Sequence, residues 1–466
     1  MAVIRIFNHY VSRVALALLL MEVLLLAAAA LGALSWLADA RQPGHANLYP
    51  PALAFALSVV LGMGALGMYR QDVRQPPRGA LRMALMRIAP ALALAFILLN
   101  PLALMLPALQ LGHAGQLAFV LGGAGVLLTR LLLLSSVRAD LLAERVILVG
   151  QGGVARECLE LAASRHGARR FQVVGCVPVP GEPLLVPAAC LLPEHDSLLA
   201  LARAHGAAEI IVSLAERRGG AYPARQLLEC ALGGLRVTDA AAFFEREACQ
   251  IRIESLQPAY LIFGGGFDQS FLRASVKRAF DLLASAAICL ASLPLMLVAA
   301  IGIVAEDGGP VFYRQERVGK DGHIFRILKF RSMRCDAEPD GQPRWAAQDD
   351  PRVTRIGHWM RQLRIDELPQ IFNVFRGDMS FVGPRPERAY FVEQLGRQLA
   401  CYDIRHSIKP GITGLAQVRY RYGASVDDAA CKLQYDLYYV KNNSLFLDLL
   451  ILIDTVQVVL FSKGGR

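Results

Sequence analysis

The sequence predicts three parts: a membrane α-helical N-terminal four-span block, an α/β Rossmann-like middle domain, and an α+β C-terminal domain with a re-entrant membrane helix. Three observations predict this fold class. Four apolar runs fill the first 140 residues, a glycine-rich turn follows a strand-like run, and a fifth apolar run lies between two basic segments. The expected domains are residues 1–140, 141–245 and 277–466, with a linker at 246–276 and the re-entrant helix at 277–305.

The composition indicates a protein that lies partly in a lipid bilayer. Of the 466 residues, 55% are hydrophobic and only 19% are charged, with a formal net charge of +10. The positive charge favours anionic partners such as lipid headgroups and phosphates. The nine cysteines show neither a CxxC pair nor a zinc-ligand spacing, which indicates reduced thiols facing a cytosol. Without a nucleic-acid-binding motif, nucleic acid is not an expected partner.

The N-terminal block is expected to cross the membrane four times. Each run is long enough, or nearly so, for a hydrocarbon core of about 30 Å. The loop between the second and third runs carries five arginines and one aspartate, so both ends of the block are predicted to be cytoplasmic. Glu22 should face other helices or line an ion or substrate pathway, and Arg130 can snorkel to the interface. The runs cover residues 14–37, 50–69, 88–109 and 116–134.

The middle domain alternates strand-like and helical runs. A strand-like VILVG leads into a Gly-x-Gly-x-x-Ala turn at 150–155, and further strands are expected at 171–177 and 208–214. This spacing is typical of dinucleotide binding, but the acid expected after the second strand is missing, because prolines displace Glu182. A dinucleotide site and a structural or regulatory domain are both open, and no tight NAD binding is predicted.

Two apolar segments of the C-terminal part are expected to enter the membrane, or lie on it, without crossing. The run from Leu282 to Ala305 could be a fifth span, but Pro294 near its middle should kink the helix. Basic residues flank both ends, so a helix that turns back at Ser292 and Pro294 satisfies the charge rule. The last run, 445–461, contains two aspartates and is expected in the interface.

An adjacent acidic pair, Asp366 and Glu367, lies among arginines in MRQLRIDELPQIFNVFRGDMSFVGPRPER. One interpretation is local: Asp366 caps the helix that follows. The other is chemical, because arginines should lower the pKa of Asp366, and an ionised carboxylate can attack phosphorus. Glu367 would then offer an oxygen to Mg²⁺, and Lys329 would neutralise charge during phosphoryl transfer. The two interpretations are compatible.

The segment GDMSFVGPRP follows this pair and is expected to present Arg385. Its glycines permit close backbone approach and its prolines stiffen the loop, which favours a bidentate contact between the guanidinium and a phosphate. A plain surface loop is the alternative.

The segments from KRAFDLL onward resemble the bacterial polyprenyl-phosphate sugar-phosphate transferases, which are monotopic phosphoglycosyl transferases. The resemblance implies a monotopic catalytic domain that uses Mg²⁺ and transfers sugar 1-phosphate from a UDP-sugar, with glucose or galactose expected, to undecaprenyl phosphate, releasing UMP. The first two domains resemble those of the long members that start exopolysaccharide, capsule or O-antigen units. The segments are KRAFDLL, GPVFYRQERVGKDGHIFRILKFRSM, LRIDELPQIFNVFRGDMSFVGPRP, KPGITGLAQV and YDLYYVKN.

The resemblance also implies roles for single residues. The acid pair of the family corresponds to Asp366, as covalent nucleophile, and Glu367, as Mg²⁺ ligand. In small members a Ser-Pro pair bends the re-entrant helix, whereas this chain has Leu293-Pro294, with Ser292 one residue earlier. The other implied catalytic and substrate-binding or phosphate-binding residues are Lys329, Arg361, Arg385, Pro386 and Asp436.

The resemblance implies a multi-pass protein of the bacterial inner membrane, with its catalytic domain on the cytoplasmic face. UDP-sugar, undecaprenyl phosphate and membrane lipid are the expected partners; a homodimer and downstream polysaccharide glycosyltransferases are also considered. The alternative function is a non-catalytic membrane regulator with a Rossmann-like sensor and a degenerate transferase domain. A degenerate domain should have lost Asp366, Glu367 or Arg385, and this chain has all three.

Overall fold

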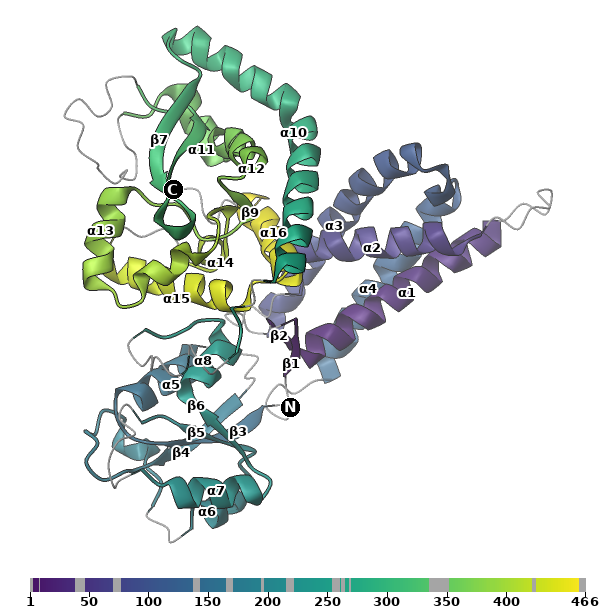
Figure 1. Ribbon diagram of the computed structural model, residues 1–466. Helices are drawn as coiled ribbons and strands as arrows, with labels where there is room; N and C mark the ends of the chain where they lie inside the picture. Colours follow the sequence, from purple (N-terminus) through teal and green to yellow (C-terminus); the bar gives the residue numbers. More distant parts are fainter. Residues whose placement is uncertain are drawn as a thin grey trace. The chain divides into compact units, whose positions relative to one another are not determined.

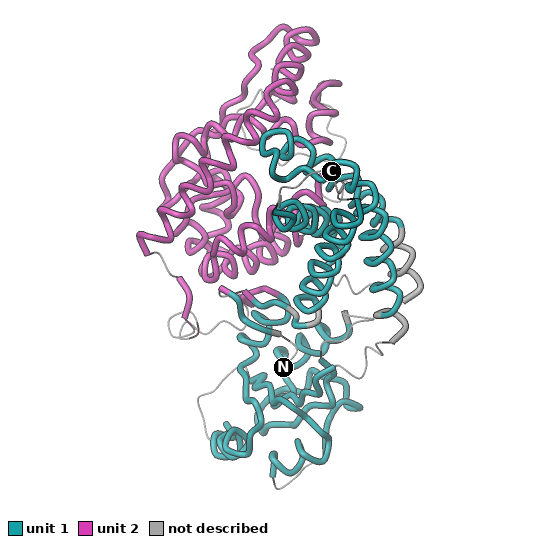
Figure 2. The backbone as a smooth tube through the Cα atoms, turned by 90° about the vertical axis from the view of Figure 1, so that its right-hand side faces the viewer, with its two compact units in different colours: residues 1–6, 10–248 teal, residues 7–9, 249–466 magenta. Residues whose placement is uncertain are grey.

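The computed structural model divides the chain into two compact units (Figure 2). The first comprises Met1–Ile6 and Tyr10–Ala248, and the second comprises Phe7–His9 and Cys249–Arg466. The finer boundaries expected from the sequence stay predictions. The structure describes residues 3–7, 9–37, 47–69, 77–136, 143–164, 171–193, 197–214, 222–253, 260, 265–267, 270–334, 352–420 and 425–460.

The N-terminal part of the first unit is a block of four apolar helices, as expected. α1 packs against α2 and α4, and α3 packs against the same two helices. Three of the helices contain stretches long and apolar enough to cross a membrane, whereas α2 is apolar but has only 17 residues. It ends earlier than expected because the chain turns at Gly67, whose φ of 72° suits glycine. The helices are α1 (Arg13–Leu37), α2 (Tyr49–Ala65), α3 (Pro77–Met105) and α4 (Ala114–Ser136).

A buried ion pair joins the first and last helices of this block. Glu22 is fully buried, and its two carboxylate oxygens accept hydrogen bonds from Arg130 Nε at 2.7 Å and Nη2 at 3.1 Å. The Tyr69 hydroxyl donates to the same carboxylate at 2.6 Å. The prediction that Arg130 snorkels is therefore wrong: pairing with Glu22 satisfies its charge within the block.

The rest of the first unit is built on a four-stranded parallel sheet of order β4-β3-β5-β6. α5 and α8 cover one face and α6 and α7 the other, because alternate residues of β3 point into two separate apolar clusters (Figure 1). The strands expected at 171–177 and 208–214 are present as β4 and β5, and β6 was not expected. The elements are β3 (Glu144–Val149), α5 (Gly153–Ser164), β4 (Phe171–Val177), α6 (Leu198–Ala204), β5 (Glu209–Val212), α7 (Ala224–Leu232), β6 (Arg236–Asp239) and α8 (Ala240–Ala248).

The second unit mixes helices with two small sheets. β7 and β8 form an antiparallel hairpin, and β9 pairs with β10 in parallel. The largest apolar cluster of this unit lies among α15, α16 and β9, around Tyr438, Tyr439 and Ile451. The elements are α10 (Phe271–Asp307), β7 (Phe312–Val318), β8 (Ile324–Phe330), α11 (Arg355–Gln362), α12 (Ile371–Arg376), β9 (Ser380–Val382), α13 (Ala389–Gln398), β10 (Gly411–Thr413), α14 (Leu415–Arg419), α15 (Val426–Asn442) and α16 (Leu445–Leu460).

α10 is one long helix that contains Pro294 and bends along its length (Figure 1). It is also long and apolar enough to cross a membrane, and many of its large apolar side chains are exposed, among them Leu290 and Ile301. The Ser292 hydroxyl contacts the carbonyl of Cys289 at 3.5 Å. Because proline has no N–H, Pro294 cannot donate a helical hydrogen bond to the carbonyl of residue 290. The Ser292 hydroxyl contacts a different carbonyl, that of Cys289, and therefore does not replace the lost bond.

Both ends of α10 are bonded to the same unit. Near the start, Lys277 Nζ contacts Asp448 Oδ2 of α16 at 2.8 Å. At the other end, the Glu306 carboxylate accepts from the amides of Arg355 and Ile356 at 2.8 and 2.9 Å, at the start of α11. Asp448 is thus paired inside the unit. It is one of the two aspartates from which an interfacial position was predicted for α16, and that position stays a prediction.

Candidate active site

The acidic pair lies in a tight 3₁₀ turn, η5 (Ile365–Gln370), and α12 begins only at Ile371. Arg364, with a φ of 60°, precedes the turn, and Asp366 lies inside it without capping a helix. The N-cap prediction for Asp366 is therefore wrong. Pro369 explains the difference, since it lacks an N–H and disfavours α-helical geometry at the residue before it. The turn places both carboxylates in the interior, where each residue is only 8% exposed.

Glu367 is held by positive side chains from three segments. Its Oε1 lies 3.1 Å from Lys329 Nζ of β8 and 2.9 Å from Arg385 Nη2, and its Oε2 lies 3.6 Å from Arg364 Nη1. Burial alone would raise the pKa of Glu367, but the charges of Arg385, Lys329 and Arg364 outweigh burial and hold the pKa well below its usual value. Glu367 is therefore ionised throughout the physiological pH range.

Asp366 has the opposite electrostatic character. Burial, and then the negative charge of Glu367, raise the pKa of Asp366 to about 6, although Lys329, Arg364 and Arg361 lower it in part. The predicted fall in this pKa is wrong, because the positive groups contact Glu367 and leave Asp366 desolvated. Within the described part of the chain, Asp366 Oδ1 has no hydrogen-bond partner. At neutral pH the carboxylate is thus mostly ionised and has one oxygen free for a new bond.

Arg385 is fixed through both its backbone and its side chain. Its guanidinium contacts Glu367 and donates from Nη1 to Gln417 Oε1 at 3.3 Å. The loop before it runs against β10, where the Gly383 amide donates to the Thr413 carbonyl at 2.9 Å. A Cβ on Gly383 would lie 2.5 Å from the Lys409 carbonyl oxygen, so this approach requires glycine. Pro386 contributes its carbonyl, which accepts from Arg317 Nη1 at 3.1 Å.

Asp436 reaches this loop through Arg405. Its Oδ2 accepts from Arg405 Nη2 at 2.8 Å and Nε at 3.1 Å, and Arg405 Nη2 also donates to the Arg385 carbonyl at 2.9 Å. Asp436 is 3% exposed and Arg405 is 6% exposed. Asp436 thus forms a buried ion pair behind the loop, and its implied contact with substrate stays a prediction. Sequence reasoning missed Arg405, although it lies just before the KPGITGLAQV segment.

Mg²⁺ fits the acid pair as a cation that needs few protein oxygens. Among the described residues, no group of three or more Asp, Glu, His or Cys side chains could enclose a metal ion. Asp366 Oδ1 is buried without a partner, and Glu367 Oε2 has only the 3.6 Å contact with Arg364 among the ion pairs described above. Mg²⁺ commonly takes one or two carboxylates and completes its shell with water and substrate phosphates. Asp366 and Glu367 could therefore hold it.

The glycine-rich turn of the middle sheet is filled by a carboxylate of the same chain. Glu182 Oε2 accepts from the amides of Gln151 at 2.7 Å and Gly152 at 3.1 Å. A Cβ on Gly152 would lie 2.9 Å from Glu182 Oε1, so glycine permits this contact. These amides point where the phosphates of a dinucleotide bind in Gly-x-Gly-x-x-Ala turns. Glu182, which prolines displace in the sequence, thus bonds to the amides of this turn.

Comparison with known proteins gives a family match that lies within the second unit. Residues 272–462 match the family model described as "Bacterial sugar transferase". The chain is 43% identical to the UDP-N-acetylgalactosamine-undecaprenyl-phosphate N-acetylgalactosaminephosphotransferase of Aeromonas hydrophila over 242 residues. The aligned residues make up 52% of this chain and 56% of that protein. It is 43% identical to the undecaprenyl-phosphate glucose phosphotransferase of Komagataeibacter xylinus, over 41% of this chain and 36% of that protein.

A shorter relative is matched over most of its length. The exopolysaccharide production protein ExoY of Rhizobium meliloti is 40% identical over 203 residues, which are 41% of this chain and 87% of that protein. The chain thus spans about half or less of the longer relatives named above, and nearly all of the shorter one. The acid pair, Lys329 and Arg385 all fall inside the matched segment.

Proposed function

Because the chain belongs to the bacterial sugar transferase family, we propose that it transfers a sugar 1-phosphate from a UDP-sugar to undecaprenyl phosphate and releases UMP. This would be the first membrane step in building a polysaccharide repeat unit. The names of the relatives include N-acetylgalactosamine and glucose, and the resemblance to the long members of the family favours glucose or galactose. The sugar is therefore proposed only as a hexose or an N-acetylhexosamine.

The observation that carries the proposal is the contrast between the two acids. Glu367 forms ion pairs with Lys329 and Arg385. Asp366 is buried beside it, its Oδ1 has no hydrogen-bond partner among the described residues, and its pKa is raised to about 6. A desolvated carboxylate that is mostly ionised at neutral pH is suited to nucleophilic attack. A degenerate, regulatory domain would have no need to keep this arrangement.

In the proposed reaction, an Oδ atom of Asp366 forms a bond to the phosphorus that carries the sugar. The bond from this phosphorus to the oxygen that bridges the two phosphates breaks, and UMP leaves with that oxygen. An oxygen of undecaprenyl phosphate then attacks the same phosphorus, which frees the Asp366 carboxylate and yields the undecaprenyl-diphospho-sugar. Lys329 and Arg385 lie beside the acid pair, where their charges would stabilise the phosphoryl oxygens in both transition states.

Arg405 and Asp436 would hold Arg385 in place during both steps, because Arg405 donates to the Arg385 carbonyl. Arg361 adds positive charge near Asp366 and would help to draw the diphosphate into the site. Mg²⁺, when bound by the acid pair, would neutralise phosphate charge and help to orient the donor.

We infer that α10 is re-entrant and does not cross the membrane. Lys277 near its start and Glu306 near its end both bond to parts of one folded unit, which supports a position of both helix ends on the same side of the membrane. The bend and Pro294 support a helix that turns back, and its exposed apolar residues would contact lipid. The unit would lie on the cytoplasmic face of the inner membrane, where UDP-sugars are available.

The middle sheet is proposed to be Rossmann-like, supported by its parallel strand order and its helices on both faces. Since Glu182 occupies the phosphate position of its glycine turn, a structural or regulatory role is favoured over dinucleotide binding. A homodimer and downstream polysaccharide glycosyltransferases stay predicted partners.

The test of the function is a two-stage labelling experiment with the full-length protein in detergent. UDP-sugars labelled in the sugar are first offered without lipid acceptor, and sugar phosphate should become bound to the protein as UMP is released. Adding undecaprenyl phosphate should then move the label to lipid. The proposal fails if no sugar in the panel labels the lipid, and the covalent route fails if lipid is labelled while the label on protein maps to a residue other than Asp366.

A further inference from the structure

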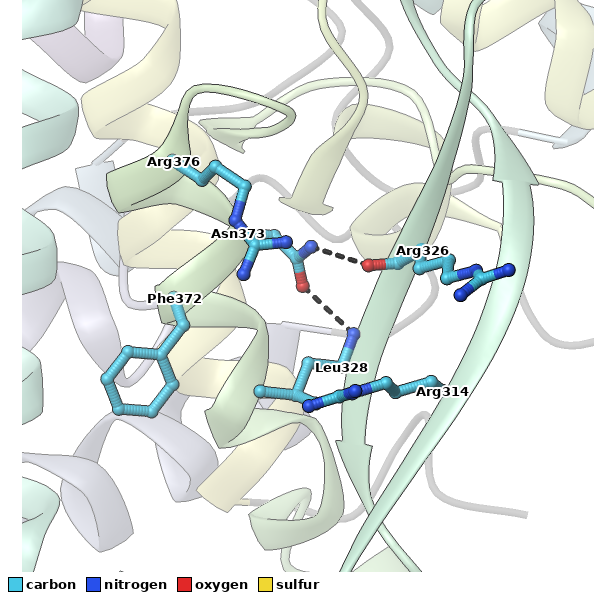
Figure 3. Close-up of a pocket in the computed structure, with 6 residues that line it drawn as sticks. All are labelled: Arg314, Arg326, Leu328, Phe372, Asn373 and Arg376. Carbon is cyan, nitrogen blue, oxygen red and sulfur yellow. Dashed lines mark hydrogen bonds between the residues drawn. The ribbon is translucent and has the colours of Figure 1, made fainter.

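The outer face of the β7–β8 hairpin carries a hollow of about 280 Å³ that is separate from the acid pair. In the hairpin, Arg314 is paired with Leu328, and Glu316 with Arg326, so these residues share one face. Lys329 follows Leu328 and therefore points to the opposite face, toward Glu367. The arginine hollow, as we call it, is lined by Arg314, Arg326, Leu328, Phe372, Asn373 and Arg376 (Figure 3).

The floor of the arginine hollow is rigid. Asn373 is 1% exposed; its Oδ1 accepts from the Leu328 amide at 2.9 Å and its Nδ2 donates to the Arg326 carbonyl at 2.8 Å (Figure 3). The side-chain amide of Asn373 thus makes the two hydrogen bonds that a neighbouring strand would make, and it joins α12 to the free edge of β8. Arg278 of α10 donates to the Val374 carbonyl at 2.6 Å, which ties the end of α12 to α10. These bonds therefore join β8, α12 and α10 beneath the hollow.

The arginine hollow has an excess of positive charge. Arg326 pairs with Glu316 at 3.2 Å, and Arg376 lies 3.8 Å from Asp378. Within the part of the chain that the structure describes, the side chain of Arg314 makes no hydrogen bond or ion pair. The guanidinium groups of Arg314 and Arg376 lie toward the side of Phe372, whereas that of Arg326 points away (Figure 3). Two guanidinium groups on either side of a hollow are suited to a phosphate, which accepts several N–H bonds at once.

The surroundings of the arginine hollow indicate that the phosphate belongs to a lipid. Phe372 and Phe375 of α12 are 40% and 37% exposed, so an apolar rim borders the charged groups. α12 is bonded to Arg278, one turn before the exposed apolar run of α10 begins. The assignment to a lipid rests on the entry of α10 into the membrane proposed above: an apolar rim beside arginines, at the level where that helix enters, matches a lipid headgroup with its first acyl carbons. We propose that the arginine hollow binds the phosphate of an anionic phospholipid.

The experiment measures retention of labelled phosphatidylglycerol by the full-length protein in mixed detergent micelles. The double variant Arg314→Gln with Arg376→Gln removes both facing charges and keeps unbranched, polar side chains at both positions. Its control is the single variant Arg397→Gln, which removes one exposed positive charge of α13 away from the hollow and therefore matches the charge change of Arg314→Gln alone. Since charge-assisted hydrogen bonds to phosphate are lost, we expect retention to fall roughly tenfold in the double variant and to stay unchanged in the control.

Two further measurements separate the sources of phosphate and the effects on folding. In the first measurement, inorganic phosphate is offered in place of lipid. The lipid assignment would be overturned if wild type bound inorganic phosphate saturably, the double variant lost this binding, and both proteins retained phosphatidylglycerol equally. Equal retention of phosphatidylglycerol by wild type and double variant would overturn the proposal altogether. If the double variant unfolds at a lower temperature than wild type, the single variant Arg314→Gln is tested instead, because the Arg314 side chain has no described partner to lose. Retention of phosphatidylglycerol by this variant is expected to fall roughly threefold.

Discussion

Replacing Asp366 by asparagine separates the chemistry of this residue from its effect on folding. Asparagine keeps the size of the side chain but cannot attack phosphorus usefully. We expect transfer of labelled sugar phosphate to lipid to fall by at least about 10³-fold, as found when a covalent nucleophile is removed. The covalently bound label should also disappear.

The same substitution should make the folded protein more stable at neutral pH. Burial and Glu367 raise the pKa of Asp366 from 3.8 to about 6, which at about 1.4 kcal/mol per unit corresponds to about 3 kcal/mol. For an acid whose pKa is raised by folding, stability is highest below the unfolded pKa and is lost as pH rises toward the folded pKa. The gain from Asp366→Asn should therefore be largest above pH 6 and vanish near pH 4.

The assay is thermal unfolding of both proteins in one detergent, followed across this pH range, beside the transfer assay. Asp366→Glu serves as the control, because it keeps the charge and should keep the pH-dependent loss of stability. An asparagine variant that unfolds earlier than wild type at pH 7 would refute the burial argument. Wild-type turnover by that variant would end the nucleophile assignment.

Four other predictions concern other parts of the chain. The rate of transfer should fall as pH drops through about 6, because Asp366 must be ionised to attack; a flat profile between pH 5 and 7 would contradict its pKa of about 6. Asp436→Asn should destabilise the protein by about 3–5 kcal/mol and slow transfer, because Arg405 is left buried without its counter-charge; a Tm equal to wild type would contradict this. In a cysteine-free background, cysteines placed at Ser275 and Pro310 should both react from the cytoplasmic side only, whereas labelling of the second from the periplasm would establish a crossing helix. Calorimetry of the full-length protein with NAD should show no tight binding, and Glu182→Ala should expose the amides of Gln151 and Gly152 to anions. A dissociation constant for NAD in the low micromolar range with wild type would show that Glu182 does not block the site.

The sequence by itself determined the features that depend on neighbouring residues. The apolar helices, the strands at 171–177 and 208–214, and the acid pair among arginines follow from periodicity and adjacency, which are local. The early end of α2 and the 3₁₀ turn were missed even though Gly67 and Pro369 are visible in the sequence, because apolar periodicity dominated those predictions.

Only the tertiary structure decided which charges meet. Arg130 pairs with Glu22 across 108 positions, and Lys329 reaches Glu367 across 38, so neither pair leaves a local pattern. The pKa of Asp366 rises because the fold buries it beside the negative charge of Glu367, and these two effects outweigh the positive groups; sequence proximity suggested the reverse. Burial and long-range contact set these energies, and both arise only when distant segments pack together.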